Sequence, residues 1–560
     1  MSSVTSSTHL DAKSDLQRNL ADFHPNVWGE YFLQYASESI EFDQNIGAQI
    51  ETLKDEVRKM LLSKIENQLL KVNLIDSICR LGVSYHFEHE IDEVLQHIHK
   101  TCVENEEIIL EDNLHSIAVL FRVLRQQGFR VSSNVFTKFK DEQGNFRENL
   151  VTDVEGMLSL YEASHMMIHG EDILEGAMTF TSTNLEFIAT QLNPSLAAQV
   201  KYTLKQALHK NLPRLEARRY INIYEQNPLH SEILLTLAKL DFNMLQTLHQ
   251  KEFGNICMWW IGMDVPRKFS FARDRIVECC FWILTVYYEP QFSQARKIMT
   301  KLIAMLSIID DTFDAYGTID ELELFAKTIE RFFRWDVKNL DDLPEYMKLI
   351  YKMVLKNLEE IEQDMTKEGR LFTLKYYIKE FQMTVDAFMT EARWFNNNYV
   401  PTIEEYLNIS KISSAQSLLI TCSYIGMGDI ATENIFKWVS DKPKMVNAVA
   451  TLCRLMDEIV SSEFEHKRGH VCSLLDCIMK QNEMSREAAI EECRERIVNT
   501  WKDINEECLK PTEVPMPFLT RAINLSRFMD VFYKDKDNYT HSEGSMKSYI
   551  KLVLVDPIPI

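Results

Sequence analysis

The chain has 560 residues, of which 46% are hydrophobic and 26% charged, and its formal net charge is −22. One hydrophobic core rarely serves so long a chain, so two large domains are expected. The negative charge argues against a nucleic-acid-binding protein, which needs a basic surface. With only 16 glycines and 14 prolines, the chain also has too few turn residues for a typical all-β fold.

The 11 cysteines include no C-x-x-C pair, which favours a reduced, intracellular setting. No window of about eighteen residues is apolar throughout, so no membrane span is expected. The N-terminus is rich in serine and threonine but soon carries Asp11 and Asp15, whereas transit peptides are poor in acidic residues. We therefore expect residues 1–22 to form a flexible tail and the protein to be cytoplasmic.

Apolar residues recur at helical spacing along almost the whole chain. Between residues 46 and 65 they are separated by 4, 3, 4, 4 and 4 positions, which is the stripe of an amphipathic helix. No segment alternates convincingly with period two, so the sequence predicts an all-α fold. The periodicity stops around Pro228, and we expect one helical domain at residues 23–228 and a second at residues 229–560.

The first of two acidic clusters follows the apolar residues 302–309. It contains Asp310, Asp311 and Asp314, and on a helix Asp310 and Asp314 lie one turn apart on the same face. In a chain with 83 acidic residues, a solvated surface is the alternative interpretation. An acidic end on a buried helix, however, is costly unless a cation neutralises it. The cluster therefore predicts a metal site.

The second cluster repeats this spacing. Asp457, Ser461 and Glu465 are four residues apart, and Arg454 lies on the same helical face. A salt-bridged surface helix is the alternative here. Two facing rows of oxygen ligands suit Mg²⁺, which completes its coordination with water and phosphate. Together the clusters predict a magnesium site that binds a diphosphate.

Further polar and aromatic residues surround these clusters in the sequence. Arg273 and Arg275 flank one aspartate. A guanidinium group can bind phosphate through two parallel hydrogen bonds, which suits a diphosphate, although two arginines at this spacing usually lie on the surface. Trp282 follows, and its ring attracts cations, although core packing would explain it equally well. The polar residues 533–539 form either an ordinary loop or a lid.

Together these motifs resemble the plant terpene synthases of class I, especially the branch that forms sesquiterpenes. The resemblance spans nearly the whole chain, and the combination of motifs is far more specific than any one of them. The matching segments are Arg18-Asn19 followed by Trp28, Arg273 to Arg275, both acidic clusters, Lys467 to His470, and Val555 to Ile558.

The resemblance implies an inactive N-terminal helical domain of α-barrel type and a C-terminal class I terpenoid synthase bundle. It implies a Mg²⁺-dependent enzyme with three metal ions, for which Mn²⁺ is a possible substitute. The expected reaction ionises farnesyl diphosphate and cyclises it to one or more sesquiterpenes with release of diphosphate. We expect a monomer that binds this small prenyl diphosphate and no nucleic acid.

The residues expected to form the site come from four segments of the second half. The expected metal ligands are Asp310, Asp314, Asp457, Ser461 and Glu465. The residues expected to bind substrate are Arg273, Arg275, Asp310, Asp314, Arg454 and Asp457. The residues expected to contribute to catalysis are Asp311, Trp282, Tyr533 and Asp537.

Three positions depart from the family pattern. Asn19 follows Arg18 where monoterpene-forming relatives have a second arginine, and residues 413–415 are Ser-Ser-Ala where relatives often have a glycine at a helix break. Glu458 occupies a position that is usually aspartate. Because it follows Arg454 by four residues, we expect Glu458 to orient Arg454 rather than bind metal, and its replacement by aspartate to be nearly silent.

Other functions remain open at this point. The closest alternative is a monoterpene synthase acting on geranyl diphosphate. A chain-elongating prenyltransferase shares the aspartate–magnesium chemistry, but such enzymes resemble a single helical domain with two Asp-Asp-x-x-Asp motifs. A non-enzymatic helical scaffold would use the acidic faces only for solvation.

Overall fold

The computed structural model describes Arg18, Ala21 and residues 23–36, 44–63, 68–104, 112–332, 340–467 and 472–560, without the side chains of residues 44, 102, 104, 331–332 and 463–467. Almost all of the predicted tail, residues 1–22, therefore lies outside the described residues. Within the described ranges the regular structure is helical, and extended pairing is limited to one isolated bridge between Lys140 and Phe146. The predicted all-α fold is confirmed. In these ranges no helix is long and apolar enough to cross a membrane.

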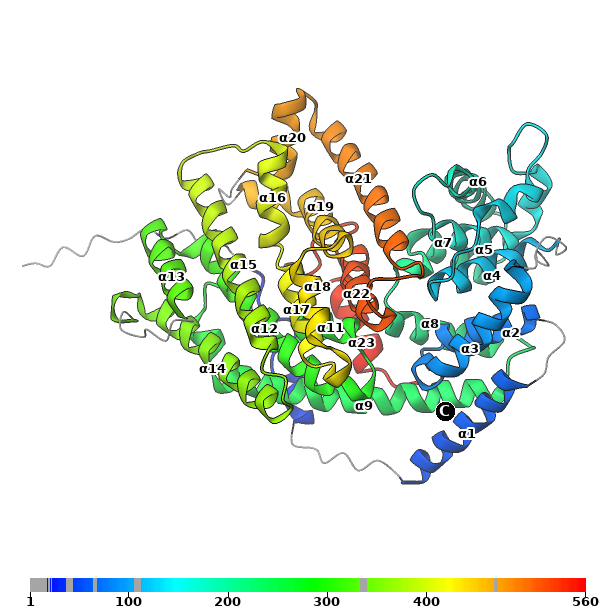
Figure 1. Ribbon diagram of the computed structural model, residues 1–560, viewed down its shortest axis with the longest axis horizontal. Coiled ribbons are helices and arrows are strands. Elements are labelled where there is room, and N and C mark those ends of the chain that lie inside the picture. Colours follow the sequence, from blue (N-terminus) through cyan, green and yellow to red (C-terminus); the bar gives the residue numbers. More distant parts are fainter. Residues whose placement is uncertain are drawn as a thin grey trace, which may run out of the picture.

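The first half of the chain forms one group of helices, coloured blue to cyan-green in Figure 1. Their buried faces share a core that includes Ile75, Phe121 and Phe136. The α-helices of this group are α1 (Gln44–Leu62), α2 (Gln68–Arg80), α3 (Glu88–Ile98), α4 (Leu114–Gln126), α5 (Val154–Ser164), α6 (Asp172–Ile188), α7 (Pro194–Lys205) and α8 (Pro213–Gln226).

The second half forms a larger bundle, coloured green to red in Figure 1. Its core includes Phe281, Leu302, Leu418 and Phe528. The α-helices of this bundle that follow residue 262 are α10 (Val265–Lys268), α11 (Ile276–Val286), α12 (Ser293–Asp311), α13 (Ile319–Phe332), α14 (Glu345–Lys367), α15 (Thr373–Asn396), α16 (Ile403–Ser413), α17 (Gln416–Ile425), α18 (Glu433–Ser440), α19 (Lys444–Lys467), α20 (Leu474–Asn482), α21 (Arg486–Glu507), α22 (Met516–Phe532) and α23 (Ser545–Leu554).

Helix α9 (Glu232–Gly262) belongs to both halves and runs beneath them in Figure 1. Its first turns, with Leu234 and Leu237, complete the first core, whereas Phe253 and Trp260 near its end belong to the second core. The turn between α8 and α9 contains the predicted boundary at residue 228. The two cores nevertheless meet along α9 rather than at that turn, because a continuous apolar helix can serve both.

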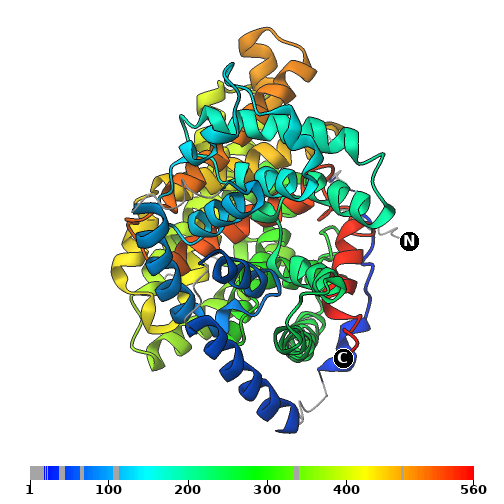
Figure 2. The same ribbon diagram turned by 90° about the vertical axis from the view of Figure 1, so that its right-hand side faces the viewer.

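Residues 23–36, here called the N-terminal strap, pack against the second half of the chain. Phe32 is buried in the second core, and the 3₁₀ helix η1 (Tyr31–Tyr35) lies on α9. Gly254 makes this close approach possible, since a Cβ atom there would lie 2.6 Å from the backbone nitrogen of Ala36. Figure 2 shows the blue strap beside the red C-terminal helix, where Lys547 donates to the carbonyl of Val27.

Two irregular helix ends shape the region that carries the acidic clusters. Helix α12 continues into a π-helical turn, η9 (Thr312–Tyr316), in which the Gly317 amide donates to the Thr312 carbonyl at 2.8 Å. Such wide turns are frequent at functional sites. Between α16 and α17, Ala415 has a left-handed φ of 56°. The helix break expected at residues 413–415 is therefore present.

Candidate active site

One cavity in the second half brings together most of the residues singled out in the sequence. The predicted residues that line it are Arg273, Trp282, Asp310, Asp311, Asp314, Arg454, Asp457, Ser461, Tyr533 and Asp537. Arg275 does not line it. Glu465 follows Ser461 by one turn of α19, but its side chain lies outside the described residues.

The end of α12 supplies one acidic wall of the cavity. Asp310 is its last residue but one, and Asp314 lies in the π turn that follows, so the turn is wider than the regular helix assumed from the spacing. Arg273 pairs with Asp310 at 2.7 Å and with Asp311 at 2.9 Å. Asp311 also accepts from the backbone nitrogen of Arg273 at 2.7 Å. Asp311 therefore anchors Arg273 and thereby orients it towards Asp310.

The protonation of this wall reflects burial first and crowded negative charge second. Burial and the Asp314 carboxylate raise the pKa of Asp310 to about 8, although Arg273 opposes the shift. Burial also raises the pKa of Asp311, again opposed by Arg273. Arg454 also opposes the shift of Asp310, but the two guanidinium groups do not offset burial and the neighbouring carboxylates. A divalent cation at this wall would restore the balance.

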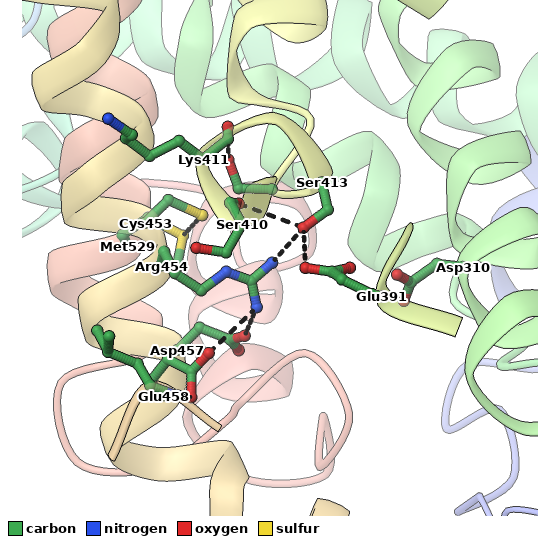
Figure 3. A network of polar contacts seen from close by, with 12 residues as sticks. Asp310, Glu391, Ser410, Lys411, Ser413, Cys453, Arg454, Asp457, Glu458 and Met529 are labelled. Atoms are coloured by element: carbon green, nitrogen blue, oxygen red, sulfur yellow. Dashed lines mark hydrogen bonds and ion pairs between the residues drawn. The ribbon is translucent and has the colours of Figure 1, made fainter. Parts of the chain in front are cut away.

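Helix α19 supplies the facing wall, and Figure 3 shows its polar contacts. Arg454 Nη1 donates to Asp457 at 3.3 Å, and its Nη2 lies 3.4 Å from the hydroxyl of Ser413 at the helix break. The buried Ser461 hydroxyl has no hydrogen-bond partner within the described chain. An unsatisfied hydroxyl on a row of oxygen donors is the arrangement that a hard cation would complete.

Glu458 does not line the cavity, and it connects three helices. Its carboxylate is 2% exposed, accepts from the Tyr406 hydroxyl, and accepts from the Leu474 amide at 2.9 Å. Arg454 lies 3.7 Å from it. The expectation that Glu458 orients Arg454 agrees with this geometry, but Glu458 also ties α19 to α16 and to the first turn of α20.

Sequence analysis missed Glu391, a further carboxylate that lines the cavity from α15. The Ser413 hydroxyl donates to it at 2.6 Å, and Figure 3 shows it between Ser413 and Asp310. Glu391 has no other acidic residue within four positions on its helix, so no acidic pattern marks it. Only the packing of α15 against the helix break reveals it.

The donor set fits a magnesium site that a ligand completes. Within the described ranges, no three His, Cys, Asp or Glu side chains lie close enough together to hold a metal ion by themselves. The candidate donors on the two walls are all oxygen atoms. Mg²⁺ commonly takes one or two carboxylates and fills its remaining positions with water and phosphate oxygens. The residues present fit this mode of binding.

Aromatic and aliphatic side chains form the inner part of the cavity. Trp282 stacks on Phe528 with ring centroids 3.9 Å apart and meets the edge of Tyr539 at 5.7 Å. Phe388, Ile303, Leu306 and Leu419 also line the cavity. Burial raises the pKa of Tyr533, and the carboxylates of Asp537 and Asp457 add to the shift, so its hydroxyl stays protonated. The chamber is apolar beneath a charged rim.

Residues 533–544, here called the C-terminal loop, close one side of the cavity. Asp537 Oδ1 accepts from the amides of Tyr539 and Thr540, both at 2.9 Å. The Tyr539 hydroxyl donates to Ser307 on α12 at 2.9 Å. The bonds to Asp537 hold the turn within the loop, and the Tyr539–Ser307 bond attaches the loop to α12.

Arg275 lies apart from the other predicted substrate-binding residues. Its side chain is buried, and its donors are directed to the carbonyls of His24, Tyr539 and Thr540 and to that of its neighbour Asp274. A guanidinium with its donors engaged in this way is not available to a diphosphate. The predicted role of Arg275 as a diphosphate ligand is not supported by this placement.

Two acidic helices that face one another across an apolar cavity define a class of metal-dependent diphosphate-binding bundles. Comparisons with known proteins agree with this class. The pattern described as "Terpene synthase family, metal binding domain" matches residues 262–503, and that described as "Terpene synthase, N-terminal domain" matches residues 27–204.

Individual relatives match almost the full length of the chain. It is 51% identical to "Probable terpene synthase 2" of Ricinus communis, over 97% of this chain and 98% of the relative. It is 49% identical to "(-)-germacrene D synthase" of Vitis vinifera, over 98% of this chain and 97% of the relative. The isoprene synthase of grey poplar, solved with three Mg²⁺ ions and dimethylallyl-S-thiolodiphosphate, has a TM-score of 0.86 at 32% identity and covers 95% of this chain and 99% of its own.

The chain belongs to the terpene synthase family. The resemblance predicted from its motifs is confirmed, and so is the expected arrangement of an N-terminal helical domain and a C-terminal metal-binding domain.

Proposed function

We propose that the protein is a sesquiterpene synthase that ionises farnesyl diphosphate with the help of Mg²⁺ and cyclises the resulting cation. The observation that carries the proposal is the pair of oxygen-bearing helices, α12 and α19, at the rim of a cavity with an aromatic interior. The relative from Vitis vinifera, which bears the name of a sesquiterpene synthase, supports the choice of substrate.

Both acidic walls take part in metal binding in this proposal. Asp310 and Asp314 on one side, and Asp457, Ser461 and Glu465 on the other, would hold the magnesium ions. By analogy with the poplar complex we expect three ions, and Mn²⁺ as a possible substitute. Bound Mg²⁺ stabilises the negative charge that develops on the diphosphate as the allylic C–O bond breaks.

Two arginines complete the binding of the diphosphate. Arg273 and Arg454 both line the cavity, one beside each acidic wall. Each guanidinium presents several donors in a plane and stays charged at any physiological pH. Charge-assisted hydrogen bonds from these donors would hold the departing diphosphate at the rim and away from the apolar interior.

The apolar interior would control the fate of the cation. Trp282 presents an aromatic ring to the cavity, and such rings attract cations. Packing of Trp282 against Phe528 and Tyr539 excludes water that would otherwise trap the cation as an alcohol. Tyr533 and Asp537 also line the cavity, and we propose that a proton lost from the final cation passes along them towards the diphosphate.

The test is a product analysis with three substrate mixtures. The purified chain is incubated with Mg²⁺ and farnesyl diphosphate, geranyl diphosphate, or farnesyl diphosphate with isopentenyl diphosphate, and volatiles are analysed by gas chromatography. We expect C15 hydrocarbons from farnesyl diphosphate, with little change on adding isopentenyl diphosphate. Preferred turnover of geranyl diphosphate would make it a monoterpene synthase. Formation of a longer prenyl diphosphate in the mixture with isopentenyl diphosphate would identify a chain-elongating prenyltransferase. If no mixture released diphosphate, the protein would be a non-enzymatic scaffold.

We further propose that the protein acts as a monomer in the cytoplasm, where farnesyl diphosphate is the expected prenyl substrate. A fluorescent fusion of the full chain should remain cytosolic, and light scattering should give the mass of one chain. Plastid import would favour geranyl or geranylgeranyl diphosphate instead.

A further inference from the structure

The segment Arg273–Arg275 joins three parts of the molecule that are far apart in sequence. Arg275 Nη2 donates to the carbonyl of His24 in the N-terminal strap and to that of Thr540 in the C-terminal loop, each at 2.8 Å. Its Nε donates to the carbonyl of Tyr539 at 3.1 Å. One buried guanidinium therefore holds the strap and the loop against each other.

Asp274 attaches the same strap a second time. Its Oδ2 accepts from the side-chain amide of Asn26 at 3.0 Å, and its Oδ1 accepts from the Trp260 indole at 2.9 Å. Because Trp260 belongs to the core around α9, the strap is fixed to the rigid body of the second half at this point.

Arg273 connects this junction with the acidic wall. Besides its pairs with Asp310 and Asp311, its Nη1 donates to the Thr540 hydroxyl at 3.1 Å. Thr540 therefore accepts from Arg273 through its side chain and from Arg275 through its backbone. The position of the C-terminal loop at the cavity depends on both arginines, but through different atoms.

The electrostatic surroundings of Arg275 include one buried acidic residue, Glu278. Glu278, on the first turn of α11, is fully buried. Burial raises the pKa of Glu278, whereas Ser542 and the Arg275 guanidinium favour its charged form. Arg275 thus makes four carbonyl contacts without any contribution from the cavity.

We propose that Arg275 is a positioning residue that clamps the N-terminal strap to the C-terminal loop, rather than a ligand of the diphosphate. The clamp keeps Tyr539 and Thr540 at the cavity in the absence of substrate. The proposal rests on the proposed function only for its kinetic consequences, because the clamp itself is a property of the ligand-free protein. Withdrawing Arg275 towards a diphosphate would leave the buried carbonyls of Tyr539 and Thr540 unsatisfied and would release the carbonyl of His24 in the strap.

Hydrogen exchange of the ligand-free full chain tests the proposal. Lysine retains the charge, but its three donors share one nitrogen, so Arg275→Lys cannot reproduce the contacts that Nε, Nη1 and Nη2 of the guanidinium make to four carbonyls. We expect exchange in residues 24–28 and 537–544 to rise at least tenfold. The matched control is Arg273→Lys, whose parent side chain faces the cavity. It should leave exchange in residues 24–28 unchanged and weaken binding of inorganic diphosphate in the presence of Mg²⁺ by at least tenfold.

A second variant separates the clamp from a folding defect. Asn26→Ala removes the attachment of the strap to Asp274, and the bonds that Asn26 accepts from the amides of Trp28 and Gly29, without touching either arginine. It should raise exchange in residues 24–28 and, through the clamp, in residues 539–540. Loosening of the strap alone would show that strap and loop are independent and would overturn the proposal.

The opposite assignment has its own signature. If Arg275→Lys left the ligand-free exchange of both segments unchanged and weakened diphosphate binding as much as Arg273→Lys, Arg275 would be a diphosphate ligand. None of these readouts requires turnover, so a wrong substrate assignment would not affect them.

Discussion

Glutamine in place of Glu458 tests how the protein holds Arg454 at the cavity. The Glu458 carboxylate accepts from Tyr406 and from the Leu474 amide and lies 3.7 Å from Arg454. Glutamine keeps the length and one acceptor oxygen, but it loses the charge and replaces the other acceptor by a donor. Removing one member of a buried ion pair costs about 3–5 kcal/mol when no acceptor remains. Because glutamine retains one acceptor, we expect Glu458→Gln to lose only about 2 kcal/mol of free energy at this site.

This loss should appear in catalysis more than in metal affinity. If about 2 kcal/mol of positioning of Arg454 is lost in the transition state, kcat/KM falls by a factor of roughly 30. The Mg²⁺ concentration for half-maximal rate should change less than about twofold, because Glu458 does not line the cavity. Steady-state kinetics over a range of Mg²⁺ concentrations measure both quantities, and Ser461→Ala, which removes a candidate ligand, provides the contrast.

The structure changes the expectation for Glu458→Asp. The sequence predicts a nearly silent substitution, but a side chain shorter by one methylene cannot reach both the Tyr406 hydroxyl and the Leu474 amide. Loss of one hydrogen bond to a charged group should cost about 1.5–3 kcal/mol of stability. The reasoning on Glu458 would be refuted if Glu458→Gln raised the Mg²⁺ requirement more than Ser461→Ala, since Glu458 would then be a metal ligand.

Three further predictions concern the acidic wall and the helix packing behind it. Asp310→Asn should lower turnover on the order of 100-fold or more without loss of stability, because it relieves repulsion from Asp314; circular dichroism and diphosphate release measure the two effects. The stability of the metal-free protein should fall as pH rises between about pH 4, where a free aspartate titrates, and the Asp310 pKa of about 8. In this range the folded protein binds more protons than the unfolded chain. In the presence of a chelator, the thermal midpoint of unfolding should be lower at pH 8 than at pH 6, and added Mg²⁺ should restore it. If Asp310→Asn showed a pH-dependent drop of equal size, the effect would belong to other groups. Gly426→Ala should destabilise the protein by about 1–3 kcal/mol, since its Cβ would lie 2.3 Å from Ala295 Cα on α12. The control Gly176→Ala on α6, where a Cβ would have no atom within 4 Å, should stabilise the protein slightly. Equal thermal midpoints of the two variants would contradict the close approach at Gly426.

Patterns that repeat along the chain could be predicted from sequence. Apolar stripes at helical spacing identify the helices, because burial of one face follows directly from that period. The rows Asp310–Asp314 and Asp457–Ser461 could be recognised since four-residue spacing places oxygen atoms on one helical face. Both rows do line the same cavity.

Features that depend on tertiary packing could not be predicted. Glu391 is an isolated acidic residue whose importance arises from the neighbouring Ser413 on another helix. Arg273 and Arg275 look alike in the sequence, but their side chains take different directions. Arg273 bonds to Asp310 at the acidic wall, whereas Arg275 bonds to His24 in the N-terminal strap. The sharing of α9 between two cores likewise leaves no trace in its continuous periodicity.

The central claim is that α12 and α19 together bind the metal ions that ionise farnesyl diphosphate. The most direct measurement is diphosphate released per molecule of hydrocarbon, over a range of Mg²⁺ concentrations, by the wild-type protein and by a folded variant with Asp310→Asn and Asp457→Asn. We predict one diphosphate per C15 hydrocarbon from the wild type, saturable release with Mg²⁺, and no release by the variant. Release by the variant at the wild-type rate, or by the wild type in excess chelator, would contradict the account.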